Sequence, residues 1–280
     1  MTTLKTIIKK ILPLKSVFLF RNPLSFIKYF GNKCYCPVCD SNFSRFISIP
    51  EVTKSDLFLT DILVNGHRNS ITNYETFNFQ TFFCPICGAQ DKVRMMAFFI
   101  KNFLNKSNNG QTKIKLLHFT PEAGLYDFLS KINNIEYYTS DLERTDVDFN
   151  FDLHNCTEIE NNSFDLIICS HVLEHVENDK RCMSEIKRML KQNGIALLMV
   201  PIMLTIDKDY ENDAITIPEQ RLLHFGQEDH VRLYSKFGFV QKLQEVGFKV
   251  NELSFDYFGK EFLKKAGLDS KNVLYVVEKI

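Results

Sequence analysis

The feature of this chain that most limits its fold is an alternation of apolar runs and amphipathic segments beyond residue 91. The run "SFDLIICS", residues 163–170, is almost uniformly apolar, as expected for a strand that is buried on both faces. A helix is predicted to follow from Asp179, because Met183, Ile186 and Met189 recur at helical spacing before "QNG" ends the pattern. Repeated strand–helix units of this kind predict a parallel, doubly wound α/β sheet.

Strands and helices are expected at defined places in this region. Strands are predicted at 115–120, 136–141, 147–152, 163–170, 195–201, 249–255 and 273–279. Helices are predicted over 93–106, 125–132 and 236–246, with Ser235 as the N-cap of the last one. No internal repeat interrupts this order, so we expect one large α/β domain.

The chain has 280 residues, of which 45% are hydrophobic and 24% charged, as is usual for a folded protein with a sizeable core. We divide it into a basic segment (1–33), a cysteine-containing module (34–90) and the α/β domain (91–280). The formal net charge is zero, so no overall field favours nucleic acid.

The first 33 residues carry seven Lys or Arg side chains and no acidic one. They could form an amphipathic helix that contacts an anionic membrane surface. A helix packed on the domain and a partner-binding arm are the alternatives. No apolar run of 18 residues and no cleavage site is present, so we expect a cytoplasmic protein, peripheral at most at the inner membrane surface.

Two C-P-x-C pairs, Cys36/Cys39 and Cys84/Cys87, are the strongest local motif. Each such turn directs two thiolates toward one metal ion, and four thiolates complete a tetrahedral structural zinc site. The 44 residues between the pairs exceed the usual separation, and Cys34 is a spare ligand that could exchange. Cys169 lies within a predicted strand and is expected in the core.

The segment "NNSFDLIICSHVLEHVENDKRCMSEIKRMLKQNGIALLMVPI", residues 161–202, resembles the fourth-to-fifth-strand region of class I S-adenosylmethionine-dependent methyltransferases of the type 11-like kind. The resemblance covers roughly residues 110–280. The C-P-x-C pairs, "PEAGL" and "FGQEDHVRLY" together resemble a bacterial subgroup with a zinc-ribbon-like module. This resemblance implies a Rossmann-like, seven-stranded sheet whose last strand is antiparallel, with the cofactor over the strand carboxyl ends.

The family's first motif, D/E-x-G-x-G-x-G, corresponds here to the turn after residues 115–120. His118 stands near the acidic position, Thr120 and Glu122 occupy glycine positions, and only Gly124 remains. Glycines there let the backbone approach the cofactor, so the turn either uses side chains instead or no longer binds it. Glu122 could pair with the amino group of the cofactor.

Three further positions follow from the resemblance. Asp141 would accept hydrogen bonds from the ribose hydroxyls, Asp152 would read the adenine amino group, and His171 would contact cofactor or substrate. A solvated strand-end or turn residue is the alternative for both aspartates, and His175 is more often structural in this motif. The implied cofactor residues are Thr120, Pro121, Glu122, Gly124, Asp141, Leu142, Asp152, Leu153, Ser170 and His171.

The segment "RLLHFGQEDHVRLYS", residues 221–235, lies where substrate lids usually sit and is rich in acid–base side chains. His230 is the leading candidate for a catalytic base, and His171 is a second one. Arg232 could hold an anionic acceptor. The alternative is a polar surface loop whose charged side chains form ion pairs only with one another.

The sequence therefore predicts an S-adenosylmethionine-dependent methyltransferase with structural Zn²⁺, acting on oxygen or nitrogen of a small molecule or saccharide. An RNA methyltransferase with a zinc module is one rival, although 27 basic residues beyond position 33 face 34 acidic ones, which argues against a phosphate footprint. A non-catalytic scaffold with a degenerate fold is the other.

Overall fold

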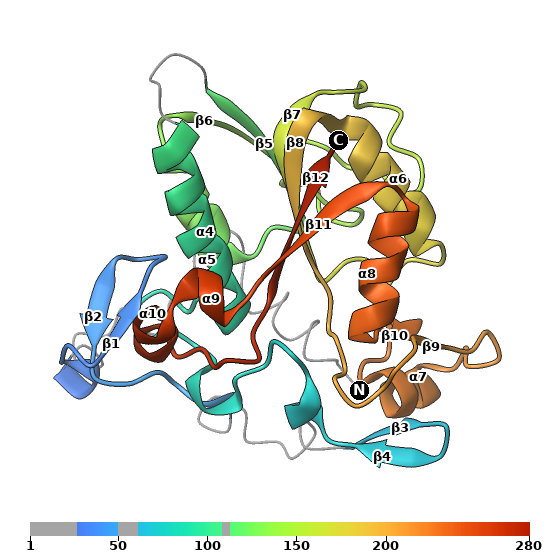
Figure 1. The fold of residues 1–280 in the computed structure, drawn as a ribbon, viewed down its shortest axis with the longest axis horizontal. Helices are drawn as coiled ribbons and strands as arrows, with labels where there is room; N and C mark the ends of the chain where they lie inside the picture. Colours follow the sequence, from blue (N-terminus) through green and yellow to red (C-terminus); the bar gives the residue numbers. More distant parts are fainter. Residues whose placement is uncertain (1–26, 50–60, 108–112) are drawn as a thin grey trace.

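A mixed β-sheet forms the centre of the protein (Figure 1), which we describe from a computed structural model over residues 27–49, 61–107 and 113–280. The sheet has the order β11-β12-β8-β7-β5-β6. Four of these strands are parallel: β5 (Ile114–Phe119), β6 (Ile135–Ser140), β7 (Phe164–Ser170) and β8 (Leu190–Met199). The last strand, β12 (Leu274–Lys279), runs antiparallel between β8 and β11 (Phe248–Leu253), as predicted.

The sheet has six strands within the described residues, so the prediction of seven is corrected. The expected strand at 147–152 makes only one isolated parallel bridge, between Phe149 and Ser140. The Asp148 carboxylate explains this, because it accepts hydrogen bonds from the backbone N–H and the hydroxyl of Thr139, both at 2.8 Å. A side chain thus takes the β6 donor that a further strand would need.

Helices cover both faces of the sheet (Figure 1). On one side lie α4 (Asp91–Ser107) and α5 (Ala123–Leu129), and on the other α6 (Asp179–Met189) and α8 (Lys236–Glu245). The Ser235 hydroxyl accepts a hydrogen bond from Gly238 N at 2.9 Å, which confirms the predicted N-cap of α8. Two short helices, α9 (Phe255–Phe258) and α10 (Lys260–Lys265), precede β12.

The cysteine module packs directly on the α/β domain. It contains the hairpin β1 (Cys34–Cys36) and β2 (Ser41–Phe43), and its Phe43 and Ile47 belong to the same apolar core as the sheet. Arg94 of α4 is fully buried and joins three parts of the chain. Its guanidinium donates to the carbonyls of Phe82 (3.0 Å), Ala89 (2.9 Å) and Ala266 (2.7 Å).

The long insert between the cysteine pairs reaches the predicted lid region. It forms a second hairpin, β3 (Ile62–Val64) and β4 (His67–Asn69), and two short 3₁₀ turns, η2 (Ile71–Asn73) and η3 (Phe79–Thr81). The predicted lid (221–235) and the residues just before it form β9 (Tyr210–Glu211), α7 (Pro218–Phe225) and β10 (Arg232–Leu233). A separate small core holds them together, formed by Ile62, Val64, Met203, Ile215, Phe225 and Leu233. The insert therefore supports the lid, which gives a reason for its length.

Gly226 ends α7 with φ +86°, a left-handed conformation that favours glycine. A Cβ at this position would lie 3.0 Å from the Tyr74 hydroxyl and 3.1 Å from Ile62 Cδ1. A side chain at residue 226 would therefore crowd the contact between α7 and the insert.

None of the helices in the described residues is both long and apolar enough to cross a membrane. Most of the basic segment predicted to contact a membrane, residues 1–26, lies outside the described residues, so that expectation stays a prediction.

Candidate active site

Two residues with left-handed backbone mark the edge of the sheet where a cofactor was expected. Thr120 follows β5 with φ 47°, and His171 follows the adjacent β7 with φ 57°. This conformation costs a non-glycine residue on the order of 1 kcal/mol or more, and such strain concentrates at functional sites. Thr120 N donates to Ser140 O at 2.7 Å, which holds the turn against the end of β6.

Glu122 lies in the same turn, inside a small network of charged and polar groups. Its Oε2 lies 2.9 Å from His118 Nε2, and its Oε1 lies 3.2 Å from Lys92 Nζ. His118 in turn contacts the Tyr137 hydroxyl through Nδ1 at 2.9 Å. Burial alone would raise the pKa of Glu122, but Lys92 and His118 outweigh it and hold that pKa well below its usual range. The carboxylate predicted to meet the cofactor is therefore already paired within the protein.

Gly124, the one glycine left in this motif, faces the cysteine module. A Cβ there would lie 3.6 Å from Ala89 Cα and 3.6 Å from Cys87 O, which is ordinary van der Waals contact. The geometry therefore gives Gly124 a packing role between α5 and the module. Pro121 is buried ahead of the helix.

Polar atoms without protein partners line the carboxyl ends of β6 and β7. Asp141 follows β6 and is buried, and its Oδ1 accepts from the backbone N–H groups of Glu143 (2.9 Å) and Arg144 (3.1 Å). Among the described residues, nothing hydrogen-bonds to Asp141 Oδ2, Ser140 Oγ or Ser170 Oγ, and all three atoms are buried. Buried polar groups normally have partners, so these atoms indicate a ligand site at this edge. The next residue along the chain, Leu142, is 63% exposed.

Asp152 is placed differently. Its side chain is 57% exposed, and Oδ1 accepts from His154 N (2.9 Å) and contacts His154 Nδ1 (2.7 Å). The backbone hydrogen bond from His154 is the main cause that lowers the pKa of this carboxyl. Within the described residues, the contacts of Asp152 involve Oδ1 alone. Leu153 is buried in the core and contributes packing.

His171, His175 and His230 surround Glu174, which is fully buried. His171 Nδ1 lies 3.2 Å from Glu174 Oε1, and burial, together with Lys92, lowers the pKa of His171. The structure thus brings the two predicted catalytic histidines, His171 and His230, to one carboxylate. His230 itself is only 2% exposed, so its position favours a role beneath the protein surface.

Arg232 does not face a cleft. It is buried, and its guanidinium donates to the carbonyls of Leu173 (2.9 Å), Val176 and Glu177 (2.8 Å) and to Glu211 Oε1 (3.2 Å). These contacts occupy the group that was predicted to hold an anionic acceptor. The geometry instead favours a structural role, in which Arg232 fixes the loop after β7 against the lid.

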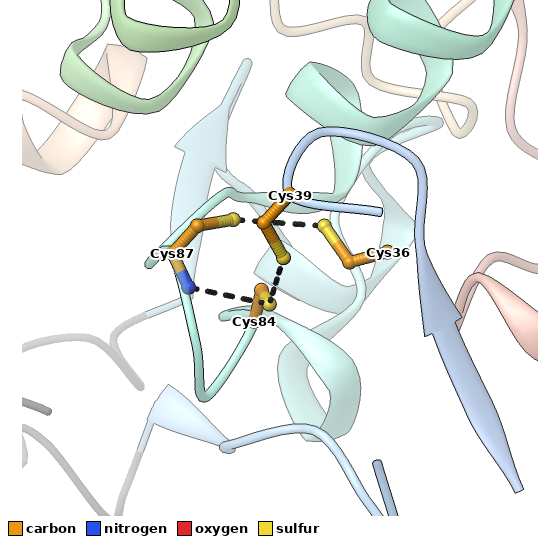
Figure 2. A group of neighbouring side chains, drawn as sticks. All are labelled: Cys36, Cys39, Cys84 and Cys87. Atoms are coloured by element: carbon orange, nitrogen blue, oxygen red, sulfur yellow. Dashed lines mark hydrogen bonds between the residues drawn. The ribbon is translucent and has the colours of Figure 1, made fainter. Parts of the chain in front are cut away.

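The four predicted metal ligands, Cys36, Cys39, Cys84 and Cys87, converge on one point (Figure 2). Cys36 Sγ lies 3.6 Å from Cys87 Sγ, and Cys39 Sγ lies 3.8 Å from Cys84 Sγ. Four sulfurs at about 2.3 Å from a tetrahedral zinc ion would be about 3.8 Å apart, so the cluster fits that ion. Backbone N–H groups of Ile86 and Cys87 point at Cys84 Sγ, as expected for thiolate ligands.

Cys34 lies outside this group, with its Sγ 3.7 Å from Ser44 O. Cys169 is buried within β7, as predicted.

Sequence reasoning missed the role of Lys92, which belongs to no motif and precedes the Glu122 turn by 30 positions. It also missed the central place of Glu174, whose signal was present: a carboxylate between two histidines directly after a buried strand.

The profile of a family described as "Methyltransferase domain" matches residues 92–253. A comparison with curated proteins found no match. Among solved structures, the CurJ carbon methyltransferase shares 17% identity at a TM-score of 0.44, covering 67% of this chain and 53% of that one. The citrinin polyketide synthase CMeT domain shares 14% at 0.45, covering 67% and 52%. The YcgJ protein from Bacillus subtilis shares 14% at 0.37, covering 63% and 94%. This chain spans about half the length of the first two.

Proposed function

Since the chain belongs to the methyltransferase domain family, we propose that it methylates an oxygen or nitrogen of a small-molecule or saccharide acceptor. The protein is an S-adenosylmethionine-dependent methyltransferase by its family, and S-adenosylmethionine is the methyl donor expected for it. The identity of the acceptor and of the methylated atom is our own proposal.

The unpartnered atoms at the carboxyl ends of β6 and β7 carry this proposal. A nucleoside donor offers ribose hydroxyls, and Asp141 Oδ2 is a buried carboxylate oxygen that can accept from them. Ser140 and Ser170 offer hydroxyls on either side of the β5 turn, since β5 lies between β6 and β7. Ligands of open α/β sheets bind at this edge. The residues present therefore fit S-adenosylmethionine, which supplies an electrophilic methyl group when bound.

We expect the acceptor to carry no negative charge. The guanidinium of Arg232 donates its hydrogen bonds to backbone carbonyls inside the protein, and Lys92 is paired with Glu122. Arg232, which was predicted to hold an anionic acceptor, is thus engaged elsewhere, and so is Lys92. His171 lies at the end of β7 with 25% of its side chain exposed, and we assign it to the acceptor side of the proposed cofactor site.

We also propose that Cys36, Cys39, Cys84 and Cys87 bind a structural Zn²⁺. Their sulfur separations support it, and four thiolates leave no open position for chemistry. Contact of residues 1–33 with a membrane surface remains a separate proposal.

The test is a calorimetric titration of pure, zinc-loaded protein with S-adenosylmethionine, followed by a mass-spectrometric screen of hydroxyl- and amine-bearing acceptors. Saturable cofactor binding and a methylated small molecule support the proposal. A salt-sensitive gel shift with RNA would instead identify RNA as the acceptor. A product methylated on carbon would contradict methylation of oxygen or nitrogen.

A further inference from the structure

A second group of metal-ligand atoms lies at the end of β7, apart from the cysteines. One ligand atom each from Glu174, His175 and His230 lies within 4.8 Å of the others. Glu174 is fully buried, and His171 Nδ1 lies 3.2 Å from its Oε1, but within the described parts of the chain no well-aligned hydrogen bond reaches either carboxylate oxygen. A buried carboxylate is costly unless a cation or donors compensate it.

Both imidazoles are oriented by contacts on their other nitrogen. His175 Nδ1 lies 3.2 Å from Asp229 Oδ2, and His230 Nδ1 lies 3.1 Å from the Phe225 carbonyl oxygen. These acceptors place the ring proton on Nδ1, which leaves the Nε2 lone pair of each ring on the side of Glu174. Metal-binding histidines commonly show this arrangement, in which a carboxylate or carbonyl holds the distal N–H.

His171 Nδ1 contacts Glu174 Oε1 directly at 3.2 Å, whereas the separations of His175 and His230 from that oxygen are longer than hydrogen bonds and suit a shared metal ion. His175 Nε2 and His230 Nε2 lie 3.8 Å and 3.9 Å from Glu174 Oε1. A nitrogen–oxygen hydrogen bond would be about 2.9 Å. Ligands at about 2.1 Å from one tetrahedral ion are about 3.4 Å apart, and wider ligand angles lengthen that distance. We propose that Glu174, His175 and His230 bind a divalent transition-metal cation at a second site, distinct from the four-cysteine cluster.

The surrounding backbone holds the three ligands in place. Val231 N donates to Glu174 O at 3.0 Å, which ties the loop after β7 to the segment that carries His230. Arg232 fixes the same loop through the Leu173 and Glu177 carbonyls. The buried arginine thus gains a specific role, since it positions two ligand-bearing segments against each other.

The donor set points to chemistry as well as to binding. One carboxylate and two imidazoles leave coordination positions open, as in catalytic rather than structural sites. Among the three ligands, His175 has the most exposed side chain, at 16%, so solvent or an acceptor would reach the ion from its side. There the cation would bind an acceptor hydroxyl and favour loss of its proton to water. This consequence rests on the proposed function, whereas the metal site itself does not.

The experiment is a titration of the full chain, with zinc in the cysteine cluster, with MnCl₂ by calorimetry and by the Mn²⁺ electron paramagnetic resonance signal. Mn²⁺ binds least tightly in the divalent series and disfavours thiolates, so it leaves the zinc in place. We expect about one Mn²⁺ per chain. Glu174→Gln and His230→Gln should each weaken binding at least roughly ten-fold. His67→Gln, in the exposed β4, is the control and should bind like the wild type.

Circular dichroism and zinc content identify the variants that keep the fold, and His175→Gln serves if one of the others does not. The proposal is overturned if the wild type binds no Mn²⁺, or if folded variants of the cluster bind it as the wild type does. A titration with S-adenosylmethionine in the same samples separates the two claims. Mn²⁺ binding without cofactor binding contradicts the proposed function and leaves the metal site intact.

Discussion

Lys92, in the first turn of α4, lies 3.2 Å from the Glu122 carboxylate in the turn ahead of α5. Cys87 precedes α4 by only four residues, so this ion pair connects the cysteine module with the cofactor edge of the sheet. The module therefore has a direct means of fixing the turn that lacks the family's glycines.

Lys92→Met should destabilise the protein by roughly 1–3 kcal/mol, because it leaves a largely buried carboxylate with His118 as its remaining partner. A double-mutant cycle with Glu122→Gln, measured by urea unfolding, should give a coupling of about 1 kcal/mol or more. Additive effects would show that the contact is incidental.

Thr120→Gly should leave stability unchanged or raise it by up to about 1 kcal/mol, since glycine adopts φ 47° without strain. Thr157→Gly is the control, because Thr157 is exposed and has no left-handed backbone to relieve. It should lose about 0.5–1 kcal/mol through backbone entropy. Equal losses at both sites in thermal unfolding would contradict the strain at the turn.

Cys84→Ser should lower the zinc content from about one ion per chain toward zero and reduce the melting temperature by several degrees. Cys34→Ser is the matched control and should retain zinc, since its sulfur lies outside the cluster. Elemental analysis and thermal melts of both variants decide the point. If only the Cys34 variant lost zinc, Cys34 rather than Cys84 would be a zinc ligand.

Glu75 predicts a pH dependence of stability. Its carboxylate is buried and accepts from the Tyr275 hydroxyl at 2.9 Å. Burial raises the pKa of Glu75 from 4.5 to about 7, although Lys236 opposes the shift. The folded state therefore favours the protonated form, and its stability contribution is present below pH 4.5 and lost as pH rises through about 7.

Glu75→Gln keeps the neutral form at every pH. The variant should be more stable than the wild type by roughly 1–3 kcal/mol at pH 8, with the difference vanishing near pH 4. Urea unfolding at several pH values measures it, with the exposed Glu261→Gln as a control that should show no such trend. A constant difference across this range would mean that Glu75 ionises normally.

Periodicity located the parallel strands well, because strands such as β7 are buried on both faces and therefore uniformly apolar. Periodicity wrongly predicted a strand at 147–152. The Asp148 carboxylate there accepts the hydrogen bond from a backbone N–H of β6, and a hydrophobic pattern does not reveal such a contact. The spacing of the cysteines was enough to predict their cluster, since each C-P-x-C motif forms a local turn that presents two thiolates.

Side chains defined by tertiary contact were harder to predict. The guanidinium of Arg232 could bind an anion, but it donates instead to the backbone carbonyls of the loop after β7. Glu122 was expected to pair with the amino group of the cofactor, but in the structure it pairs with Lys92 and His118. Asp141 could be placed at the edge of the sheet because it directly follows a strand, and the sequence shows that position.

The most direct measurement is calorimetric binding of S-adenosylmethionine to pure, zinc-loaded protein, compared with the Asp141→Asn variant. We predict saturable binding by the wild type and a loss of roughly ten- to hundred-fold in affinity for the variant, because a charged acceptor beside the ribose hydroxyls is removed. The absence of any binding by the folded wild-type protein would contradict the assignment of this sheet edge as a cofactor site.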